Sequence, residues 1–455
     1  MKIAELSTRT VEAVVDSLRP GEQADYEIRR AVADIIAQVR ARGDAALVEL
    51  TARFDWPGAS GAELVVSEAE LEKAYREADP GFVDALSLAR DNVRFFHQHE
   101  AEPDWEVVGP QGQVLGVRHL PVKRAGLYVP GGLASYASTV VMNVIPAQVA
   151  GVQELVVCTP PRRDGSVNSS VLAACWMLDV RRVFRVGGAQ AIAAMAYGTE
   201  TIPQVDVICG PGNAYVMEAK RQVQGLVGID SLAGPSEVVV VADESARPDW
   251  VAADLLAQEE HGSGAQAVLL AGSKDFCLAV EKHVQGLKLC VAAEGSRRTD
   301  DRVGSGRGTS ARGTGDDASA SGGEAISMFY PAAGEDFLAL AELFVNKYAP
   351  EHLELHLAEA RDFLGKVSSA GAIFLGAYSA TAFGDYVAGS NHVLPTGGTA
   401  RFCSPLSVQT FMRRSTVVEV AKEAAAALVE PLITLAESEG FAFHRLSAEM
   451  RKKGK

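Results

Sequence analysis

Apolar residues in the first hundred positions repeat with the spacing of amphipathic helices. The repeat over 28–39 puts its branched apolar residues on one helical face, and we expect this helix to end near Gly43. A second repeat predicts a helix over 82–96. The chain is therefore expected to begin with helices.

From about Arg124 the pattern changes to short, continuously apolar runs that alternate with helical segments such as 136–151. Strands that are apolar at every position are buried on both faces, which is typical of parallel sheets covered by helices. The last stretch, about 416–452, again has a helical pattern. The predicted strands are 125–129, 154–158, 182–186, 205–209, 236–242, 265–271, 325–330 and 371–376.

The strands fall into two groups, before and after Ser236. The sequence therefore predicts an α/β protein with two incomplete Rossmann-like domains, each built on a parallel sheet, plus small helical segments at the N- and C-termini. The expected units are an N-terminal arm over 1–20, a discontinuous first domain formed by 21–125 with 237–381, a second domain over 126–236 and a C-terminal helical region over 382–455.

One run, about 294–325, interrupts the first domain. Val303 is the only branched apolar or aromatic residue between Val291 and Ile326, and Gly, Ser, Arg and Asp dominate the rest. Such a run cannot bury enough apolar surface to offset the entropy lost on ordering. We predict a disordered surface insertion. A regulatory Arg-rich segment is the alternative, and no other feature of the sequence supports it.

Composition and charge exclude several classes of protein. Lys+Arg number 43 against 58 Asp+Glu, a net charge of −15, whereas a protein that grips nucleic-acid backbone needs a positive face. No run approaches the roughly 20 apolar residues that cross a bilayer. The six cysteines form no CxxC pair, and the first twenty residues lack a secretory signal pattern. We expect a cytoplasmic protein with no nucleic-acid or membrane partner.

Three glycine-rich segments, 126–132, 186–198 and 209–213, each follow or end a predicted strand. The carboxyl ends of strands in open α/β sheets bind ligands, and the helix N-termini there attract phosphate. Taken singly, these segments are explained equally well by glycines that only serve a turn. Neither GxGxxG nor GxxxxGK[ST] occurs.

Four short segments combine a histidine with a carboxylate or carboxamide side chain. Imidazole nitrogen and carboxylate oxygen are ligands that suit zinc. The spacing does not show that the segments converge, and for any single one a structural histidine is the simpler interpretation. The remaining five histidines, among them His356, are assigned structural roles. The four segments are Gln258–His261, Glu351–His352, Asp385–His392 and Glu439–His444.

Eight motifs occur in a fixed order along the chain. They are GLYVPGG, VGGAQAIAAMAYGT, ICGPGNAYVMEAKR, AGPSEVVVVAD, DLLAQEEHG, YAPEHLEL, GDYVAGSNHVLPTGGTARF and EGFAFH. Together they resemble the histidinol dehydrogenase family, from near the N-terminus to about Arg451 apart from the insertion. The resemblance implies oxidation of L-histidinol through L-histidinaldehyde to L-histidine, the last step of histidine biosynthesis, with two NAD reduced and one water consumed.

The resemblance also implies the site residues. One zinc ion per subunit would be held by Gln258, His261, Asp385 and His444. The substrate would contact Ser236, Gln258, His261, His352, Asp385, His392, Glu439 and His444. NAD would contact Tyr128, Gln190 and Asn213. The family further implies a homodimer whose active site is shared, with His444 coming from the partner subunit and the region 382–455 making dimer contacts.

Glu351 and His352 match the acid–base pair of the family. An imidazole with an ordinary pKa of about 6.5 can accept the proton of an alcohol near neutral pH, and a carboxylate can activate the water that hydrates the aldehyde. Adjacent residues on a strand point to opposite sides, so both can reach one substrate only if the backbone turns there. Pro350 fits such a turn.

Other functions stay open. A related zinc- and NAD-dependent dehydrogenase could act on another small polar alcohol, although Glu439 and His444 favour an imidazole-bearing substrate that needs a closing ligand and a carboxylate. A zinc hydrolase would need no nicotinamide, and a binding protein would not need the intact acid–base pair. Cys403 offers a thiohemiacetal nucleophile for the aldehyde stage, but a small filler residue explains it more simply.

Overall fold

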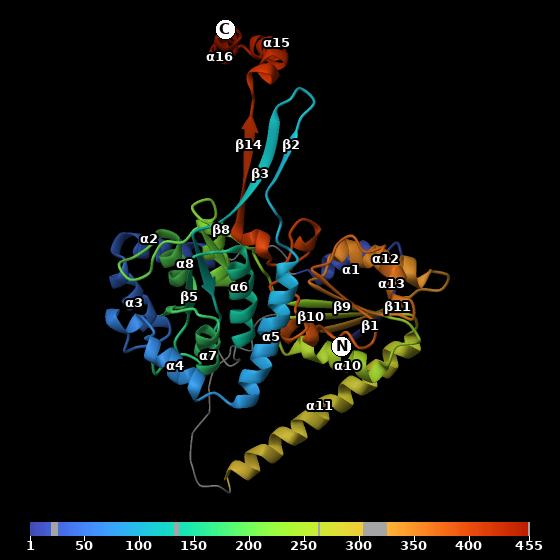
Figure 1. Cartoon of the computed structure of the whole chain (residues 1–455). Helices are drawn as coiled ribbons and strands as arrows, with labels where there is room; N and C mark the ends of the chain where they lie inside the picture. Colours follow the sequence, from blue (N-terminus) through green and yellow to red (C-terminus); the bar gives the residue numbers. More distant parts are fainter. Residues whose placement is uncertain (20–25, 132–135, 263, 304–324, 454–455) are drawn as a thin grey trace.

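The computed structural model describes residues 1–19, 26–131, 136–262, 264–303 and 325–453. It contains two parallel sheets covered by helices, and a smaller antiparallel sheet that projects from them (Figure 1). The predicted α/β class with two parallel sheets is confirmed. No helix in these ranges combines the length and the apolar character needed to cross a membrane.

The larger sheet has six parallel strands in the order β1-β11-β10-β9-β12-β13. Its alternate residues point to two separate apolar cores, so the sheet is buried on both faces. Helices α1 (Val11–Leu18), α12 (Phe337–Tyr348) and α13 (Ala360–Leu364) cover one face, and α10 (Pro248–Glu259) and α11 (Lys274–Val303) cover the other. The strands are β1 (Lys2–Leu6), β9 (Glu237–Ala242), β10 (Gln266–Ala271), β11 (Ile326–Pro331), β12 (His352–His356) and β13 (Ala372–Leu375).

The smaller parallel sheet has five strands in the order β6-β5-β4-β7-β8. They are β4 (Arg124–Tyr128), β5 (Glu154–Thr159), β6 (Arg182–Arg185), β7 (Val207–Cys209) and β8 (Gly228–Ile229). One face packs against α4 (Glu68–Arg76), α5 (Pro80–Gln98), α6 (Ala137–Ala150) and α7 (Ser169–Met177). The other face packs against α2 (Tyr26–Arg42), α3 (Asp44–Phe54), α8 (Gly188–Tyr197) and α9 (Ala214–Val223).

The packing of the N-terminal helices differs from the expected domain boundaries. We expected 21–125 to join 237–381, but α2 to α5 bury their apolar faces on the five-stranded sheet. Val32 and Leu47, for example, share a core with Val156 of β5. The N-terminal segment 1–20, which we expected to be separate, forms β1 at the edge of the six-stranded sheet and α1, which packs on that sheet. The apolar face of a helix does not show which sheet the helix packs against, so the position of these helices in the sequence did not predict the domain to which they belong.

The antiparallel sheet joins parts of the chain that are far apart in sequence. It consists of β2 (Trp105–Val108), β3 (Val114–Pro121) and β14 (Met412–Glu419), in the order β14-β3-β2. Beyond it, α15 (Lys422–Ser438) and α16 (Ala442–Lys453) stand away from the two parallel sheets (Figure 1). The predicted C-terminal helices are present from Lys422 onward, but residues 416–419, which we expected to be helical, belong to β14, whose pairing with β3 was not predicted. We call these three strands and two helices the arm.

The predicted insertion is partly helical. Helix α11 continues through Val303, so the expectation of disorder is wrong for 294–303. Residues 304–324 lie outside the described part of the chain. The remaining short elements are α14 (Thr381–Tyr386) and 3-10 turns at Gly61–Leu64, Thr399–Arg401 and Val408–Phe411.

A buried ion pair holds the turn that follows β7. Lys220 of α9 and Asp230 after β8 contact each other with side chains only 1% and 4% exposed. Lys220 Nζ also donates to the Gly210 carbonyl at 3.1 Å, and Asp230 Oδ2 accepts from the Gly210 N–H at 2.7 Å. Gly210 has φ +116°, and a Cβ there would lie 2.1 Å from the Tyr128 carbonyl. This explains the first of the two glycines, Gly210, in the third glycine-rich segment.

Replacing Lys220 with methionine should leave the Asp230 carboxylate buried without its charged partner. We expect Lys220→Met to lower the free energy of unfolding by about 3–5 kcal/mol, because a broken buried pair leaves an uncompensated charge. Chemical denaturation measures the difference. The neighbouring Arg221→Met is the control, since Arg221 is 46% exposed and its surface pair with Glu218 should contribute only about 0–1 kcal/mol. Equal losses in both variants would contradict the prediction.

Candidate active site

The predicted acid–base pair lies where α12 leads into β12. Helix α12 ends at Tyr348; the next residue, Ala349, has the left-handed backbone conformation with φ 50°, and the chain then turns through Pro350. Glu351 immediately precedes β12, and His352 begins it. Both are buried, and His352 Nδ1 lies 3.6 Å from Glu351 Oε2. The expected backbone turn therefore brings the two adjacent side chains together.

Glu351 is fixed by the neighbouring strand β9. Its Oε2 accepts hydrogen bonds from Ser236 Oγ at 2.7 Å and from the backbone N–H of Glu237 at 2.9 Å. His352 Nδ1 lies 3.2 Å from the Glu237 carbonyl. Burial raises the pKa of Glu351, against the opposing effects of His352 and of these hydrogen bonds. Ser236, predicted to bind substrate, thus also orients the carboxylate.

A second set of predicted residues surrounds His352. Asp385 of α14 places Oδ1 3.7 Å from His352 Nε2, and its backbone carbonyl lies 2.8 Å from His392 Nδ1. Burial opposes ionisation of Asp385, but the nearby His352, His392 and His261 outweigh it and hold its pKa below the usual range. Asp385 therefore lies beside His352 and His392, and the exposed His261, just after α10, is near enough to affect it electrostatically.

The electrostatics differ between the two imidazoles of this group. Burial opposes protonation of His352, but the Glu351 and Asp385 carboxylates outweigh it and raise the pKa of His352 to about 9. For His392 burial dominates, and its pKa is lowered. The structure thus favours a charged His352 beside a neutral His392 while both carboxylates are free to interact with them.

Gln258 provides the test of whether these residues suit a metal. It lies in the last turn of α10 with 3% of its surface exposed, and α10 packs against α14. Its side-chain Nε2 is buried and has no hydrogen-bond partner among the described residues. The carboxamide can also be placed in the flipped orientation, in which the side-chain oxygen occupies the position of the unpartnered nitrogen. A buried, unsatisfied carboxamide on a helix that packs against the helix of Asp385 fits a zinc ligand set.

The residues predicted to contact NAD lie at the five-stranded sheet, not at the six-stranded sheet that carries Glu351 and His352. Tyr128, Gln190 and Asn213 line one cavity of about 780 Å³ at the carboxyl ends of the strands of the five-stranded sheet. Tyr128 accepts a hydrogen bond from the Gly188 N–H at 3.1 Å. Asn213 caps α9 through its side-chain oxygen, which leaves its amide group for another partner. By contrast, Glu351 and His352 lie at the amino end of β12.

Two predicted residues are not brought to the site within one chain. Glu439 and His444 lie in the connection between α15 and α16 and at the start of α16, and both are exposed. These helices occupy the end of the arm, away from α10 and from the six-stranded sheet (Figure 1). Their predicted contact with the metal or the substrate therefore needs a second chain.

Three residues near the site were missed by the sequence analysis. Glu237 is buried beside Glu351, Thr139 places Oγ1 3.4 Å from His392 Nε2, and Asp55 lines the cavity and accepts from Gln190 Nε2 at 3.5 Å. Glu237 could have been found, because it is a charged residue at the start of an otherwise apolar strand. Thr139 and Asp55 carry no comparable signal in the sequence.

Comparisons with known proteins identify the family. A family model described as histidinol dehydrogenase matches residues 18–298 and 335–452. A protein named histidinol dehydrogenase from Synechococcus sp. is 46% identical over 438 residues, which cover 95% of this chain and 94% of that protein. One of the same name from Pseudomonas aeruginosa is 44% identical over 429 residues, covering 94% of this chain and 92% of that protein.

A solved structure is also similar. The crystal structure of histidinol dehydrogenase from Elizabethkingia anophelis has a TM-score of 0.88 and 31% identity, and the match covers 100% of this chain and 98% of that one. The two parallel sheets and the family match define an α/β oxidoreductase. The chain belongs to the histidinol dehydrogenase family. The resemblance inferred from the ordered motifs is thereby confirmed, and the stretch that the family model leaves unmatched contains most of the predicted insertion.

Glu237 generates a pH-dependent prediction. Burial, followed by the Glu351 charge, raises the pKa of Glu237 from 4.5 to about 7. Between these values the folded chain holds a proton that the unfolded chain releases, so the free energy of unfolding should fall as pH rises. Glu237→Gln has no titrating group at this position and should not show this loss. The free energy of unfolding of the variant minus that of wild type should therefore rise by about 2 kcal/mol between pH 5.5 and pH 8.

Chemical denaturation at several pH values measures this difference. Glu342→Gln, at a solvent-exposed carboxylate of α12, is the control and should show no such trend. A constant difference between Glu237→Gln and wild type over this range would show that Glu237 does not carry the proton.

Proposed function

We propose that this chain oxidises L-histidinol to L-histidine with NAD as the hydride acceptor, in a zinc-containing site shared between two subunits. The observation that carries the proposal is the arrangement of Asp385 and His392 beside the buried Glu351–His352 pair. The family, named for a dehydrogenase of histidinol, supports the substrate.

Gln258, His261 and Asp385 would hold the zinc ion, and His444 of the partner subunit would complete the set. Histidinol has an imidazole and an amine, both of which bind zinc, so the ion would anchor and orient the substrate. Only one of the four proposed ligands is a carboxylate, which leaves the loaded site positive and able to hold a neutral amine. His392 and Glu439 of the partner subunit would add polar contacts to the substrate.

The cavity beside Tyr128 would bind NAD. Its size falls within the usual range for small-molecule sites, roughly 300–1,000 Å³. The N-termini of α8 and α9 lie at glycine-rich turns there, where backbone N–H groups favour phosphate. NAD supplies the hydride acceptor when bound, and the chain supplies its orientation.

His352 would act as the base in the first oxidation. It accepts the proton of the substrate alcohol while hydride leaves the carbon, and this gives histidinaldehyde. The raised pKa of His352 depends partly on Asp385. Because Asp385 is also a proposed zinc ligand, its carboxylate would be less available to His352 in the loaded site, and the pKa of His352 would fall toward neutrality.

Glu351 would act between the two oxidations. Its carboxylate takes a proton from water, the oxygen of that water adds to the aldehyde carbon, and the protonated His352 returns its proton to the aldehyde oxygen, which gives a hydrate and a neutral His352. His352 then accepts a proton from the hydrate as a second hydride leaves, and L-histidine is formed. Ser236 and the Glu237 N–H hold the Glu351 carboxylate in one orientation for this role.

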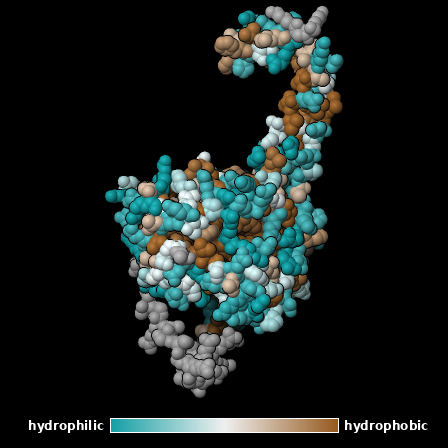
Figure 2. Space-filling model, turned by 60° about the vertical axis from the view of Figure 1, so that its left-hand side comes forward, coloured by the Kyte–Doolittle hydropathy of each residue, from teal (hydrophilic) through white to brown (hydrophobic). Residues whose placement is uncertain are grey.

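The arm supports the proposed dimer. Large apolar side chains on its strands and helices are exposed, and Figure 2 shows hydrophobic residues along it and at its end. Apolar surface of this extent on a projecting element marks an association site. A second copy that packs on the arm would receive the tip bearing Glu439 and His444. The residues are Trp105, Val107, Val108, Val418, Val420, Leu432, Leu435, Phe441, Phe443 and Leu446.

The proposed location is the cytoplasm. Four of the six cysteines are buried and all six are free thiols. Buried free cysteines behave as small apolar residues and persist in a reducing compartment. NAD-dependent biosynthesis from a small metabolite is consistent with such a compartment.

The reaction is tested by counting products. We expect two NADH to form for each histidinol consumed, because the alcohol is oxidised twice. Absorbance of NADH and quantified histidine measure the ratio, and removal of zinc with a chelator should abolish turnover until zinc is restored. One NADH per molecule, or oxidation of other small polar alcohols at the same rate, would contradict the proposed reaction.

The shared metal site is tested by mixing two inactive variants. His261→Asn and His444→Asn should each lose zinc and activity as homodimers. Random heterodimers would contain one intact site, because His261 of one subunit meets His444 of the other. Half of the dimers would be mixed, so activity should recover to about one quarter of wild type. Absence of recovery, with mixed dimers demonstrated by mass spectrometry, would show that the two residues do not act across subunits.

A further inference from the structure

A row of polar side chains runs along one face of β12, beneath the candidate site. Leu353 and Leu355 point into the apolar core shared with α1 and α12. Alternate residues of a strand point to opposite faces, so His352, Glu354 and His356 share the other face, on the side of α10. All three are buried, and Glu354 is 0% exposed. The proposed mechanism uses only the first of them.

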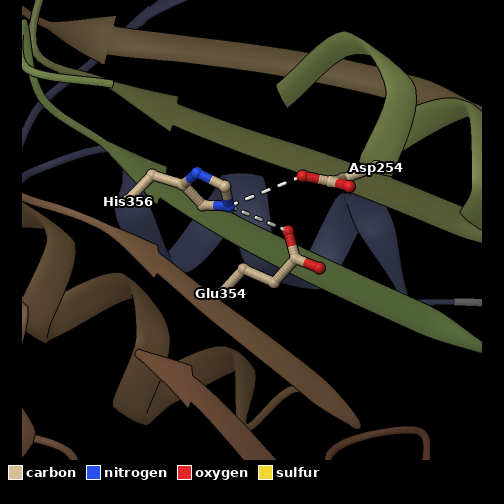
Figure 3. A group of neighbouring side chains, drawn as sticks. All are labelled: Asp254, Glu354 and His356. Carbon is tan, nitrogen blue, oxygen red and sulfur yellow. Dashed lines mark hydrogen bonds and ion pairs between the residues drawn. The ribbon is translucent and has the colours of Figure 1, made fainter. Parts of the chain in front are cut away.

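Glu354 and His356 form a cluster with Asp254 of α10. His356 Nε2 lies 3.2 Å from Glu354 Oε2 and 3.5 Å from Asp254 Oδ2, so the imidazole faces both carboxyl groups (Figure 3). Burial and then the Glu354 charge raise the pKa of Asp254 to about 7. The cluster ties α10 to β12.

Glu354 also ties β12 to α14. Its Oε1 accepts hydrogen bonds from the backbone N–H of Thr381 at 2.6 Å and from Thr381 Oγ1 at 2.7 Å. Thr381 is the first residue of α14, and no side chain within that helix caps its start. The position of α14 relative to the sheet therefore depends on a carboxylate from β12.

Each of the three connected elements also carries a candidate site residue one structural repeat away. Residues four apart on a helix share a face, which places Gln258 one turn beyond Asp254 on α10 and Asp385 one turn beyond Thr381 on α14. On β12, His352 lies two residues before Glu354, on the same face. The cluster thus forms a lower layer under the layer of site residues.

The cluster is a costly element of the core. Two carboxyl groups and an imidazole lose their hydration there, and an apolar layer of the same volume would be as stable or more stable. Both oxygens of Glu354 already have partners within the described residues, one at Thr381 and one at His356. Directional hydrogen bonds specify the relative positions of three elements, which an apolar layer would do less strictly.

We propose that Asp254, Glu354 and His356, with Thr381, are positioning residues that hold α10, β12 and α14 in register so that Gln258, His352 and Asp385 meet. This proposal rests on the proposed function for its consequences on zinc and catalysis. For the metal-free chain the proposal concerns only how well ordered α14 is and how α10, β12 and α14 are spaced.

The test replaces Glu354, which connects all three elements. Glu354→Leu keeps the approximate volume and removes both acceptor oxygens, whereas Glu354→Gln keeps one oxygen that can accept from Thr381. In the full-length protein, we expect Glu354→Leu to weaken zinc binding roughly tenfold to hundredfold, as seen when groups behind metal ligands are removed. Competition with a chromogenic chelator measures the affinity, and Glu354→Gln should recover most of it.

Three controls separate positioning from general damage. The affinity for NAD, measured by fluorescence without zinc, should stay within about twofold in Glu354→Leu, because the cavity lies at the other parallel sheet. Asp249→Asn alters an exposed carboxylate of the same helix α10 and should bind zinc like wild type. Thr381→Val, which removes one hydroxyl, serves if Glu354→Leu does not fold, and should weaken zinc binding by a smaller factor.

Hydrogen exchange of the metal-free protein gives a readout that does not depend on the proposed function. We expect amides of 381–388 to exchange faster in Glu354→Leu and Thr381→Val, with the five-stranded sheet unchanged. If wild type binds no zinc, the proposed function fails, and this exchange still decides the positioning role. Unchanged exchange and zinc affinity in a folded Glu354→Leu, or equal losses in Glu354→Leu and Glu354→Gln, would overturn the proposal. A second tightly bound metal ion per wild-type chain, lost in Glu354→Gln, would also overturn it.

Discussion

The candidate site depends on the parallel pairing of β9 with β12. In its register His352 lies opposite Val238, which brings Ser236 and the Glu237 backbone beside Glu351. A carboxyl group with 7% exposure needs hydrogen-bond donors, and the end of β9 supplies two of them. The position of the proposed acid–base pair is thus set by backbone pairing within a rigid sheet, and Asp385 lies beside it.

The same strand separates two environments. One face of β12 contributes leucines to an apolar core, and the other bears a continuous polar row. Burying that row costs free energy that the hydrogen bonds of Glu354 to His356 and Thr381 partly offset, and these bonds favour one particular approach of α10 and α14. The buried polar side chains of β12 therefore have two effects: their burial costs free energy, and their hydrogen bonds determine where α10 and α14 lie relative to the site.

The two parallel sheets contribute differently. The five-stranded sheet has a cavity at the carboxyl ends of its strands, the usual position for ligands in open α/β sheets. The six-stranded sheet presents its reactive groups at the amino ends of β9 and β12 instead. Thr139, at the start of α6, reaches His392 and connects the two halves. The exposed apolar residues on the arm support the proposed association with a second chain.

The amino-acid sequence by itself determined the α/β class, eight of the strands and the candidate residues, because buried parallel strands and reactive motifs leave local patterns. It did not reveal β14, whose partner β3 is distant in sequence, or the sheet on which α2 to α5 pack. The strand β12 was overlooked because its alternating polar residues hide a fully buried element. Only the tertiary structure decided that His356 belongs with Asp254 and Glu354, since partners of buried polar groups come from separate elements that meet after folding.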